Sequence, residues 1–532
     1  MTPADLARSG TVAPLVRRLV GAPDPLALYH RVSAGGRLPD TAILESADRT
    51  GQTGERSLIA VRSALRIRAF GRTVEVDPLT PNGEAAAAFL AARHADALRP
   101  REPGARTFAF AADPGDGPER DRFRRRSPFD LLRTLAHGPV LLAAPNRWCH
   151  LLLGTFGYDA IEYFEPLPAG REDPLGQPTL EFWLPDQLLV IDHARQTTTV
   201  VTTAWGGDGA DRRYHDASRS LEALVQLVQD GRAPTPAVPP PAPVRVEADV
   251  DQDDAAYAAV VARLKEHIAA GDVYQIVPSR TFALPCSDPL GAYAALRVRN
   301  PSPYLFFLAG RERTLFGASP ETCLRVDGPS RTAAILPIAG TVPRGRTPDG
   351  RIDPDADIRN EVTLRLDPKE LAEHLMLVDL ARNDVARISV PGTRTVARLL
   401  TVERYSHVMH LVSEVTGTLA PGIDALEAYA ATMNMGTLVG APKVRAAELL
   451  REHEPSRRGC YGGAVGYLLH DGTLETAIVI RSAVVADGMA RVRAGAGVVL
   501  DSDPVREADE TSRKARAVLE AIAAAAGEPA HV

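Results

Sequence analysis

The sequence is poor in cysteine, in long apolar runs and in charge of one sign, and each shortage excludes a class of protein. Its four cysteines, Cys149, Cys286, Cys323 and Cys460, show neither the CxxC spacing of a zinc site nor the density of a disulfide framework. No run approaches the roughly 18 apolar residues of a membrane span, and the N-terminus lacks a basic region followed by an apolar core. A net charge of −6 argues against nucleic acid as a partner. These observations predict a soluble protein of the reducing cytoplasm.

A proline-rich stretch divides the chain into two parts. Residues 231–243 are dense in proline and are expected to form a stiff, extended connector. We therefore predict an N-terminal region at 1–230, a linker at 231–247 and a second domain at 248–526, a division that a chain of 532 residues allows. The first part contains strand-like and helix-like runs, but no catalytic constellation is recognisable in it.

The most informative stretch lies near the C-terminus, where a glycine-rich turn leads into a helix with acidic residues on one face. Bare backbone at Gly495 and Gly497 lets N–H groups approach an anion closely. Glu507 and Glu510 are three residues apart and so share a helix face, and Lys514 lies one turn beyond Glu510. Two carboxylates on one face suit Mg²⁺, which prefers oxygen ligands. The alternative is a strand–turn–helix with an exposed ion pair between Glu510 and Lys514.

Two helix starts carry the same signal, an aspartate cap followed by proline at the first helical position: Asp503-Pro504 and Asp367-Pro368. The second of these helices is apolar almost all round over residues 371–382, which predicts that it is buried. Glu373 lies among its leucines, and an unpaired buried charge costs several kcal/mol. This carboxylate therefore needs a partner, either a cation shared with Glu510 or a core arginine.

Several other positions leave alternatives open. His410 lies in an apolar run, where a histidine is more often a satisfied core residue than a functional one. Arg481 interrupts a β-branched run that predicts a strand, and its guanidinium needs a carboxylate from a ligand or from a distant Asp or Glu. Residues 344–360 are polar and predict a mobile loop. Hairpin turns are expected at Asp471-Gly472 and Asp487-Gly488.

Taken together, these segments resemble the chorismate-utilising enzymes, and among them the component I subunits (aminase and lyase) of anthranilate synthases. The matching motifs follow one another along nearly the whole chain: Ile43-Leu-Glu-Ser46, Gln275-Ile-Val-Pro-Ser279, Pro337-Ile-Ala-Gly-Thr341, residues 373–384, Val408-Met-His-Leu-Val412, Gly440-Ala-Pro-Lys443, Tyr461-Gly-Gly-Ala-Val-Gly466 and residues 493–514. The resemblance implies an α+β fold in which two large, strongly twisted antiparallel β-sheets pack as a sandwich with helices on the outer faces.

The resemblance also implies a role for each matched position. The Mg²⁺ ligands would be Glu373 and Glu510, with Glu507 close by. The two carboxylates of the substrate would be held by Gly340, Thr341, Tyr461, Arg481, Gly495, Ala496, Gly497 and Lys514. His410 would be the acid/base residue, and the other catalytic positions would be Thr341, Glu321 and Gln275.

The reaction implied by the resemblance is the Mg²⁺-dependent amination of chorismate at C2 and the elimination of pyruvate, which gives anthranilate for tryptophan biosynthesis. Isochorismate and salicylate synthases have a water-activating lysine where this chain has Gln275, which cannot be a base. Aminodeoxychorismate synthases have a nucleophilic lysine at the position of Ala339. Both differences favour attack by ammonia at C2. The alternatives are a 2-amino-2-deoxyisochorismate synthase of secondary metabolism, which stops before pyruvate loss, and a non-catalytic tryptophan-binding or scaffold subunit.

The ammonia needs a source. A glutaminase would show a Gly-x-Cys-x-Gly nucleophile turn, whereas the nearest candidate, residues 458–462, has arginine in place of the first glycine. The resemblance therefore implies a separate glutamine amidotransferase subunit, and a hetero-oligomer is expected.

Two further segments resemble the tryptophan feedback site of the family. By that match the indole pocket would be lined by Glu45, Ser46, Pro303, Tyr304 and Leu305. Ile43 and Leu305 stand where Leu and Met are commoner, which are conservative changes. For Ser46 the alternative is a simple cap at the end of a strand. Tryptophan is accordingly expected to be an inhibitor.

Overall fold

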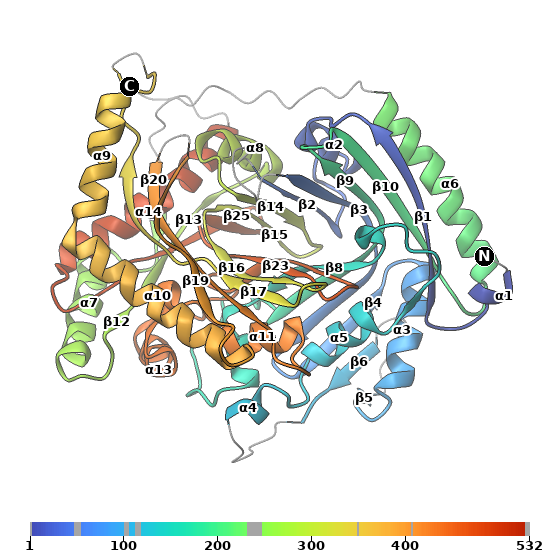
Figure 1. Cartoon of the computed structure of the whole chain (residues 1–532), viewed down its shortest axis with the longest axis horizontal. Helices are drawn as coiled ribbons and strands as arrows, with labels where there is room; N and C mark the ends of the chain where they lie inside the picture. The colour runs from blue at the N-terminus through green and yellow to red at the C-terminus, as the bar shows by residue number, and fades with distance from the viewer. Residues whose placement is uncertain are drawn as a thin grey trace.

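Two β-layers lie at the centre of the structure, and helices cover their outer faces (Figure 1). The computed structural model describes residues 3–46, 55–99, 106–111, 119–230, 247–347, 350–405 and 408–526. The predicted linker at 231–247 lies outside the described residues except for Glu247. Among the described helices, none is long and apolar enough to cross a membrane.

The first layer combines strands from both parts of the chain. In the order of their antiparallel pairing, its strands are β1 (Thr11–Val20), β10 (Thr197–Trp205), β9 (Leu180–Asp192), β3 (Arg56–Phe70), β2 (Thr41–Glu45), β14 (Tyr304–Ala309), β15 (Thr314–Ser319), β24 (Ser482–Ala486), β25 (Met489–Gly495), β13 (Ser279–Pro285) and β11 (Asp249–Val250). A short parallel pairing adds β7 (Val140–Leu141) beside β1. Because β2 pairs with both β3 and β14, this sheet is shared by the N-terminal region and the predicted second domain.

The second layer is shared in the same way, because β8 pairs with β22. In pairing order its strands are β5 (Leu98–Arg99), β6 (Arg106–Ala109), β4 (Thr73–Pro78), β3, β9, β8 (Leu151–Phe156), β22 (Ala464–Leu469), β23 (Leu474–Ile478), β16 (Thr322–Asp327), β17 (Thr332–Ile335) and β20 (Val408–Thr418), which also pairs with β18 (Ile338–Pro343) and β19 (Thr395–Arg404). A separate small sheet joins β12 (Gln275–Ile276) to β21 (Gly440–Ala441). Strands from both sides of the linker hydrogen-bond to one another in both layers. The division of the chain into two domains at the linker stays a prediction.

Two long strands, β3 and β9, belong to both layers. Residues 56–62 of β3 pair with 187–192 of β9, and residues 63–69 pair with 180–185, with shifts of register between the two sets. Such bulges bend a strand and increase its local twist, so both strands turn there from one layer into the other. The predicted antiparallel sandwich is confirmed, and its two sheets are joined through these strands.

Helices cover the outer faces of both layers. The α-helices are α1 (Pro3–Leu6), α2 (Pro25–Val32), α3 (Pro81–Arg93), α4 (Glu119–Arg122), α5 (Phe129–His137), α6 (Ala210–Gln229), α7 (Asp254–Ala269), α8 (Pro289–Arg299), α9 (Pro354–Leu366), α10 (Pro368–Ile388), α11 (Ala425–Thr432), α12 (Gly436–Val439), α13 (Lys443–His453) and α14 (Pro504–Ala525), with 3₁₀ turns at Arg147–Cys149 and Tyr158–Tyr163. Apolar residues of α2, α8 and α14 form one core with the first layer, and those of α3, α5, α10 and α11 form another with the second. A third core, which includes Trp183 and Leu308, lies between the layers.

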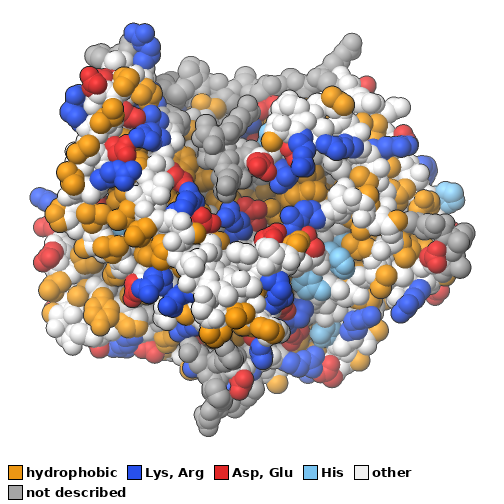
Figure 2. All heavy atoms as spheres, in the orientation of Figure 1, with side chains coloured by type: hydrophobic (Ala, Val, Ile, Leu, Met, Phe, Trp, Pro, Cys, Tyr) orange, Lys and Arg blue, Asp and Glu red, His pale blue; other side chains and the backbone are white. Residues whose placement is uncertain are grey.

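The region around α9 and α10 differs from the sequence expectation in two ways. The expected polar loop at 344–360 contains the start of α9, whose cap Asp353 accepts hydrogen bonds from the N–H groups of Asp355 and Ala356. The helix α10 is buried along one side only, and its Leu375 is 48% exposed. Figure 2 shows hydrophobic side chains on the surface over these two helices, at the left. The apolar composition of α10 therefore does not reflect burial all round.

Candidate active site

The C-terminal motif folds as its sequence predicts. Strand β25 ends at Gly495, and α14 starts at Pro504 after the cap Asp503, which accepts from the Arg506 N–H at 2.9 Å. A Cβ atom at Gly495 would lie 2.6 Å from the carbonyl oxygen of Pro278 and 3.0 Å from the Tyr461 hydroxyl. A Cβ atom at Gly497 would lie 2.7 Å from the side-chain nitrogen of Gln275. The rigid backbone of Pro278 restricts the first position to glycine, whereas a larger residue at the second position would displace the end of the Gln275 side chain. Tyr461 thus lies beside Gly495, and Gln275 beside Gly497.

The residue between the two glycines braces the turn. The N–H of Ala496 donates to the Pro278 carbonyl at 3.2 Å, and Ala496 is fully buried. Just beyond the turn, Val498 and Ile276 exchange backbone hydrogen bonds of 2.8 and 3.1 Å. The Ala496 N–H is therefore already used inside the protein, and the role of the backbone at 495–497 in holding the substrate stays a prediction.

Two cations, Lys514 and Arg481, lie beside this turn. The Lys514 ammonium donates to the Gly495 carbonyl at 3.0 Å and pairs with Glu510 at 2.7 Å. The Arg481 guanidinium donates to the Lys514 carbonyl at 2.8 Å, and no described carboxylate lies within ion-pair distance of it. Burial lowers the pKa of Arg481. An incompletely neutralised guanidinium favours an anionic ligand here, rather than a distant Asp or Glu of the protein.

Arg481 does not lie on a strand, contrary to the sequence expectation. Strand β23 ends at Ile478 and β24 begins at Ser482, and Arg481 between them has a φ of 51°. The left-handed conformation is uncommon for a residue with a long side chain. The break lets the arginine leave the pleat of the sheet, and its guanidinium reaches the Lys514 carbonyl on α14.

Four glutamates from α10 and α14 form an acidic group. Burial, and then the neighbouring Glu370, raise the pKa of Glu373, and Glu510 raises it further. Burial also raises the pKa of Glu370 and of Glu507, with Glu510 contributing to both. Burial acts against ionisation of Glu510 as well, but Lys514 holds the pKa of that carboxyl below its usual value. The carboxylates that were predicted from two distant helices thus lie within electrostatic range of one another.

The acidic group has the chemistry of a divalent-cation site without being a finished coordination shell. Within the described ranges, no three His, Cys, Asp or Glu side chains are gathered closely enough to hold a metal ion. One carboxylate oxygen of Glu507 is nevertheless buried without a hydrogen-bond partner. Mutually repelling carboxylates with an orphaned oxygen fit a hard cation with oxygen ligands, which would relieve both penalties.

His410 lies on β20, opposite the backbone of Thr341 on β18. Its Nδ1 donates to the Gly340 carbonyl at 3.3 Å. A carbonyl oxygen can only accept, so the neutral ring carries its proton on Nδ1 and its lone pair on Nε2. Burial, together with the positive charge of Arg481, lowers the pKa of His410, which makes the neutral base the form present at neutral pH. The side chain of Thr341 lies outside the part that the structure describes.

Glu321 lies at the turn between β15 and β16 and is 8% exposed. Burial raises its pKa to about 8, although a hydrogen bond from the Thr437 hydroxyl (3.1 Å) and the charge of Lys514 act in the opposite direction. The carboxyl is consequently protonated at neutral pH and can donate a proton. The side chain of Gln275 is 2% exposed, and its amide oxygen is buried without a partner.

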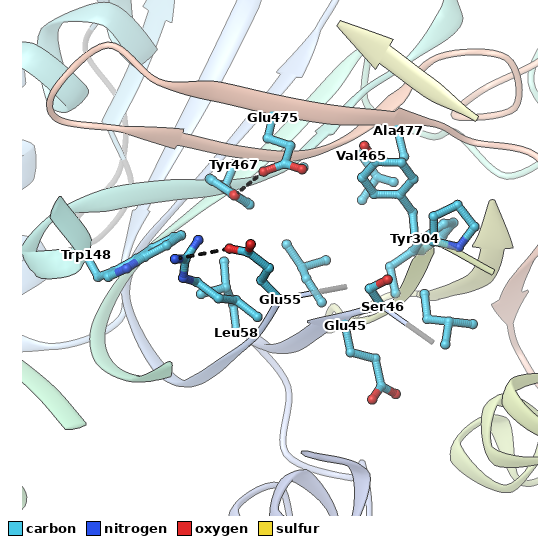
Figure 3. A pocket seen from close by; sticks show the side chains of 16 residues that line it. Glu45, Ser46, Glu55, Leu58, Trp148, Tyr304, Val465, Tyr467, Glu475 and Ala477 are labelled. Carbon is cyan, nitrogen blue, oxygen red and sulfur yellow. Dashed lines mark hydrogen bonds and ion pairs between the residues drawn. The ribbon is translucent and has the colours of Figure 1, made fainter. Parts of the chain in front are cut away.

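A pocket lined by the residues of the predicted tryptophan site lies between the two layers (Figure 3). We call it the second pocket, to distinguish it from the candidate active site described above. It encloses about 680 Å³, counted with the open solvent at its mouth, and all five predicted residues line it: Glu45, Ser46, Pro303, Tyr304 and Leu305. The Glu45 carboxylate, however, points away from the pocket in Figure 3. It accepts from the Tyr293 hydroxyl at 2.6 Å and pairs with Arg297 at 3.1 Å. Its predicted contact with a ligand is therefore limited to the backbone.

The structure adds functional candidates that sequence reasoning missed. Glu370 approaches the site, since a Cβ atom at Gly340 would lie 3.2 Å from one of its carboxylate oxygens. The sequence could have indicated Glu370, because it lies three residues before Glu373 and so on the same face of the helix. In the second pocket the additional polar and aromatic lining residues are Glu55, Arg56, Trp148, Tyr467 and Glu475. They come from strands and a turn far apart in sequence, and no local pattern marks them.

Comparison with known proteins gives a consistent result. A family model described as chorismate binding enzyme matches residues 103–520. The chain is 47% identical over 506 residues to anthranilate synthase component 1 of Salmonella typhimurium, covering 94% of this chain and 95% of that protein. It is 46% identical over 514 residues to the pyocyanine-specific anthranilate synthase component 1 of Pseudomonas aeruginosa, covering 95% and 93%. The crystal structure of anthranilate synthase component I from Streptococcus pneumoniae matches with a TM-score of 0.67 at 28% identity, covering 88% and 92%.

Proposed function

This chain belongs to the chorismate binding enzymes, as its motifs indicate, and we propose that within this family it converts chorismate and ammonia into anthranilate, pyruvate and water, as the large subunit of an anthranilate synthase. The observation that carries the choice of nucleophile is Gln275. Its buried amide oxygen can accept a hydrogen bond from ammonia, but an amide cannot remove a proton from water. The buried Ala339 offers no nucleophile of its own.

The dianionic substrate would be held by donors and cations around the glycine turn. Arg481 and Lys514 supply positive charge, and the Tyr461 hydroxyl lies beside Gly495. The backbone at Gly340 and Gly497 would supply further donors to a carboxylate. Mg²⁺ bound by Glu373 and Glu510, with Glu507 close by, would neutralise the ring carboxylate and orient the ring.

The protonation states of Glu321 and His410 assign one catalytic role to each residue. In the first step ammonia attacks C2, the double bond shifts, and the C4 hydroxyl leaves as water with the proton of Glu321. The added nitrogen loses a proton to solvent and the Glu321 carboxylate takes one up again, so that 2-amino-2-deoxyisochorismate is formed. In the second step His410, neutral at its Nε2, removes the proton from C2 while the C3–oxygen bond breaks. The leaving group departs as the enolate of pyruvate and takes up a proton from solvent, the His410 imidazolium releases its proton, and the ring becomes aromatic.

Anthranilate fluorescence and pyruvate release together test this function. The purified chain, with chorismate, Mg²⁺ and an ammonium salt, is expected to form both products in equal amounts. Amination without pyruvate release would instead identify a 2-amino-2-deoxyisochorismate synthase, and no consumption of chorismate would identify a non-catalytic subunit. Glutamine in place of ammonium is expected to support turnover only after a glutamine amidotransferase subunit is added, because we propose that this partner supplies the ammonia.

We further propose that tryptophan binds in the second pocket and inhibits the reaction. The aromatic and aliphatic walls suit an indole ring, and Arg56 and Glu475 offer opposite charges to an amino acid's carboxylate and ammonium groups.

Tryptophan is expected to raise the apparent KM for chorismate. Leucine, which has the same polar groups but no indole, is the matched ligand control and is expected to have no effect at equal concentration. Ser46→Ala removes one hydrogen bond to the ligand, which contributes about 1 kcal/mol. The variant is therefore expected to need about fivefold more tryptophan for the same inhibition. Unaltered kinetics at millimolar tryptophan would contradict the proposal.

A further inference from the structure

The chain segment that carries Glu321 forms part of the structure around the second pocket. This segment, Ser319–Thr322, passes from β15 in the first layer to β16 in the second. On the side of the first layer, Ser319 is the β-ladder partner of Tyr304, which lines the pocket. On the side of the second layer, Thr322 is the ladder partner of Ala477, which also lines the pocket. Two pocket walls therefore bracket Glu321.

A direct side-chain hydrogen bond reinforces this arrangement. The hydroxyl groups of Tyr304 and Thr322 lie 2.8 Å apart, and Thr322 is 4% exposed. Figure 3 shows the Tyr304 ring reaching into the pocket towards Val465 and Ala477. A ligand that packs against this ring therefore contacts Tyr304, and the hydroxyl of Tyr304 is hydrogen-bonded to Thr322, the residue after Glu321.

The backbone of Glu321 is held from the same two directions. Its carbonyl accepts from the Ile478 N–H at 3.0 Å, and Ile478 follows the pocket residue Ala477. Its N–H donates to the Ser319 hydroxyl at 3.4 Å. The register of β16 against β23 shifts immediately after Thr322, and such an irregularity disrupts regular pairing locally. The ladder is thus interrupted next to the segment that both sites share.

We propose that Tyr304 and Thr322 are positioning residues through which a ligand in the second pocket displaces the Glu321 carboxyl from its productive orientation. This inference rests on the proposed function, because it assigns a route to the proposed inhibition. The route needs no displacement of whole sheets: a change in the Tyr304 ring, transmitted through one hydrogen bond to Thr322, moves the adjacent carboxyl. A shift of about 1 Å in a catalytic group is sufficient to reduce the rate strongly, so this route lowers kcat in addition to the expected rise in the apparent KM.

The test is a double-mutant cycle on the hydrogen bond. Thr322→Val keeps the shape of the side chain, removes its hydroxyl and does not alter the pocket lining, so calorimetry is expected to give a tryptophan Kd within about threefold of the wild type. The tryptophan concentration that gives half-maximal inhibition is nevertheless expected to rise at least about fivefold more than this Kd does. Tyr304→Phe is expected to weaken this coupling to a similar extent, and the double variant no further than either single one, since all three remove the same bond.

A matched control exists where the helix α2 meets the strand β2. The hydroxyl of Tyr29 lies 2.9 Å from the hydroxyl of Thr41, a pair of the same kind outside the pocket lining. Tyr29→Phe is expected to leave unchanged the ratio of the half-inhibitory tryptophan concentration to the tryptophan Kd. Binding and inhibition that are both unaltered in Thr322→Val would overturn this coupling alone. Absence of tryptophan binding to the wild type would overturn both the coupling and the proposed feedback.

Discussion

The Glu373→Gln variant is expected to lose at least about 10³-fold in kcat/KM for chorismate, and Glu510→Gln is expected to lose a similar factor. A cation held by these carboxylates contributes several kcal/mol of charge stabilisation, and about 1.4 kcal/mol corresponds to tenfold in rate. Glutamine preserves the shape of glutamate and removes its charge. The loss should therefore appear without unfolding, as measured by anthranilate fluorescence at saturating Mg²⁺ and ammonium.

A structural readout separates metal binding from other effects. Mg²⁺ is expected to raise the Tm of the wild type, because a ligand that binds only the folded state stabilises it, and not to raise the Tm of Glu373→Gln. Glu448→Gln is the matched control. Glu448 lies on α13, is not part of the acidic group, and forms an ion pair with Arg445 at 2.9 Å. Wild-type turnover in either Glu373→Gln or Glu510→Gln would refute the metal assignment.

The Glu321→Gln variant is expected to lose about 10²- to 10⁴-fold in the amination step, the usual contribution of a positioned acid. Glutamine cannot give a proton to the departing hydroxyl, although it can keep the hydrogen bond from Thr437. The measurement is single-turnover consumption of chorismate. Retention of more than a tenth of the wild-type rate constant would remove Glu321 from its proposed role.

The pH dependence of the same step follows from the raised pKa of Glu321. The acid works only while protonated, so the rate constant should fall as pH rises through about 8. Comparison at a fixed concentration of free ammonia removes the titration of the substrate itself. In Thr437→Val the fall should move to higher pH, because the hydrogen bond that favours the ionised carboxylate is lost. An unchanged alkaline limb in Glu321→Gln would show that another group titrates there.

The local elements of the site were readable from short sequence patterns. Asp-Pro pairs start both α10 and α14, because the aspartate caps orphan N–H groups and proline needs no donor at the first position. The hairpin turns at Asp471-Gly472 and Asp487-Gly488 connect β22 to β23 and β24 to β25 as expected. Asp353-Pro354 carries the same signal for α9, and the polar composition of residues 344–360 obscured it.

Two features could not be read from local patterns because they depend on which surfaces face each other. The apolar sequence of α10 predicted burial all round, and this was wrong because one side of the helix has no neighbouring element to cover Leu375. Glu45 lines the predicted tryptophan pocket, but alternation along β2 turns its carboxylate towards α8, where Arg297 pairs with it. Which side of a strand or helix meets a partner is a property of the packed layers.

The sequence by itself determined where helices and turns begin and which acidic, basic and glycine residues are available, because capping, turn chemistry and residue type act over a few neighbours. The family and the antiparallel sandwich followed from the resemblance of its motifs to those of known enzymes. Only the tertiary structure decided which of these residues meet. It brought the glutamates of α10 within electrostatic range of those of α14, gave Glu321 and His410 their shifted pKa values, and placed Tyr304 between a pocket and the segment that carries Glu321. Burial and electrostatic range depend on distances in space between residues far apart along the chain.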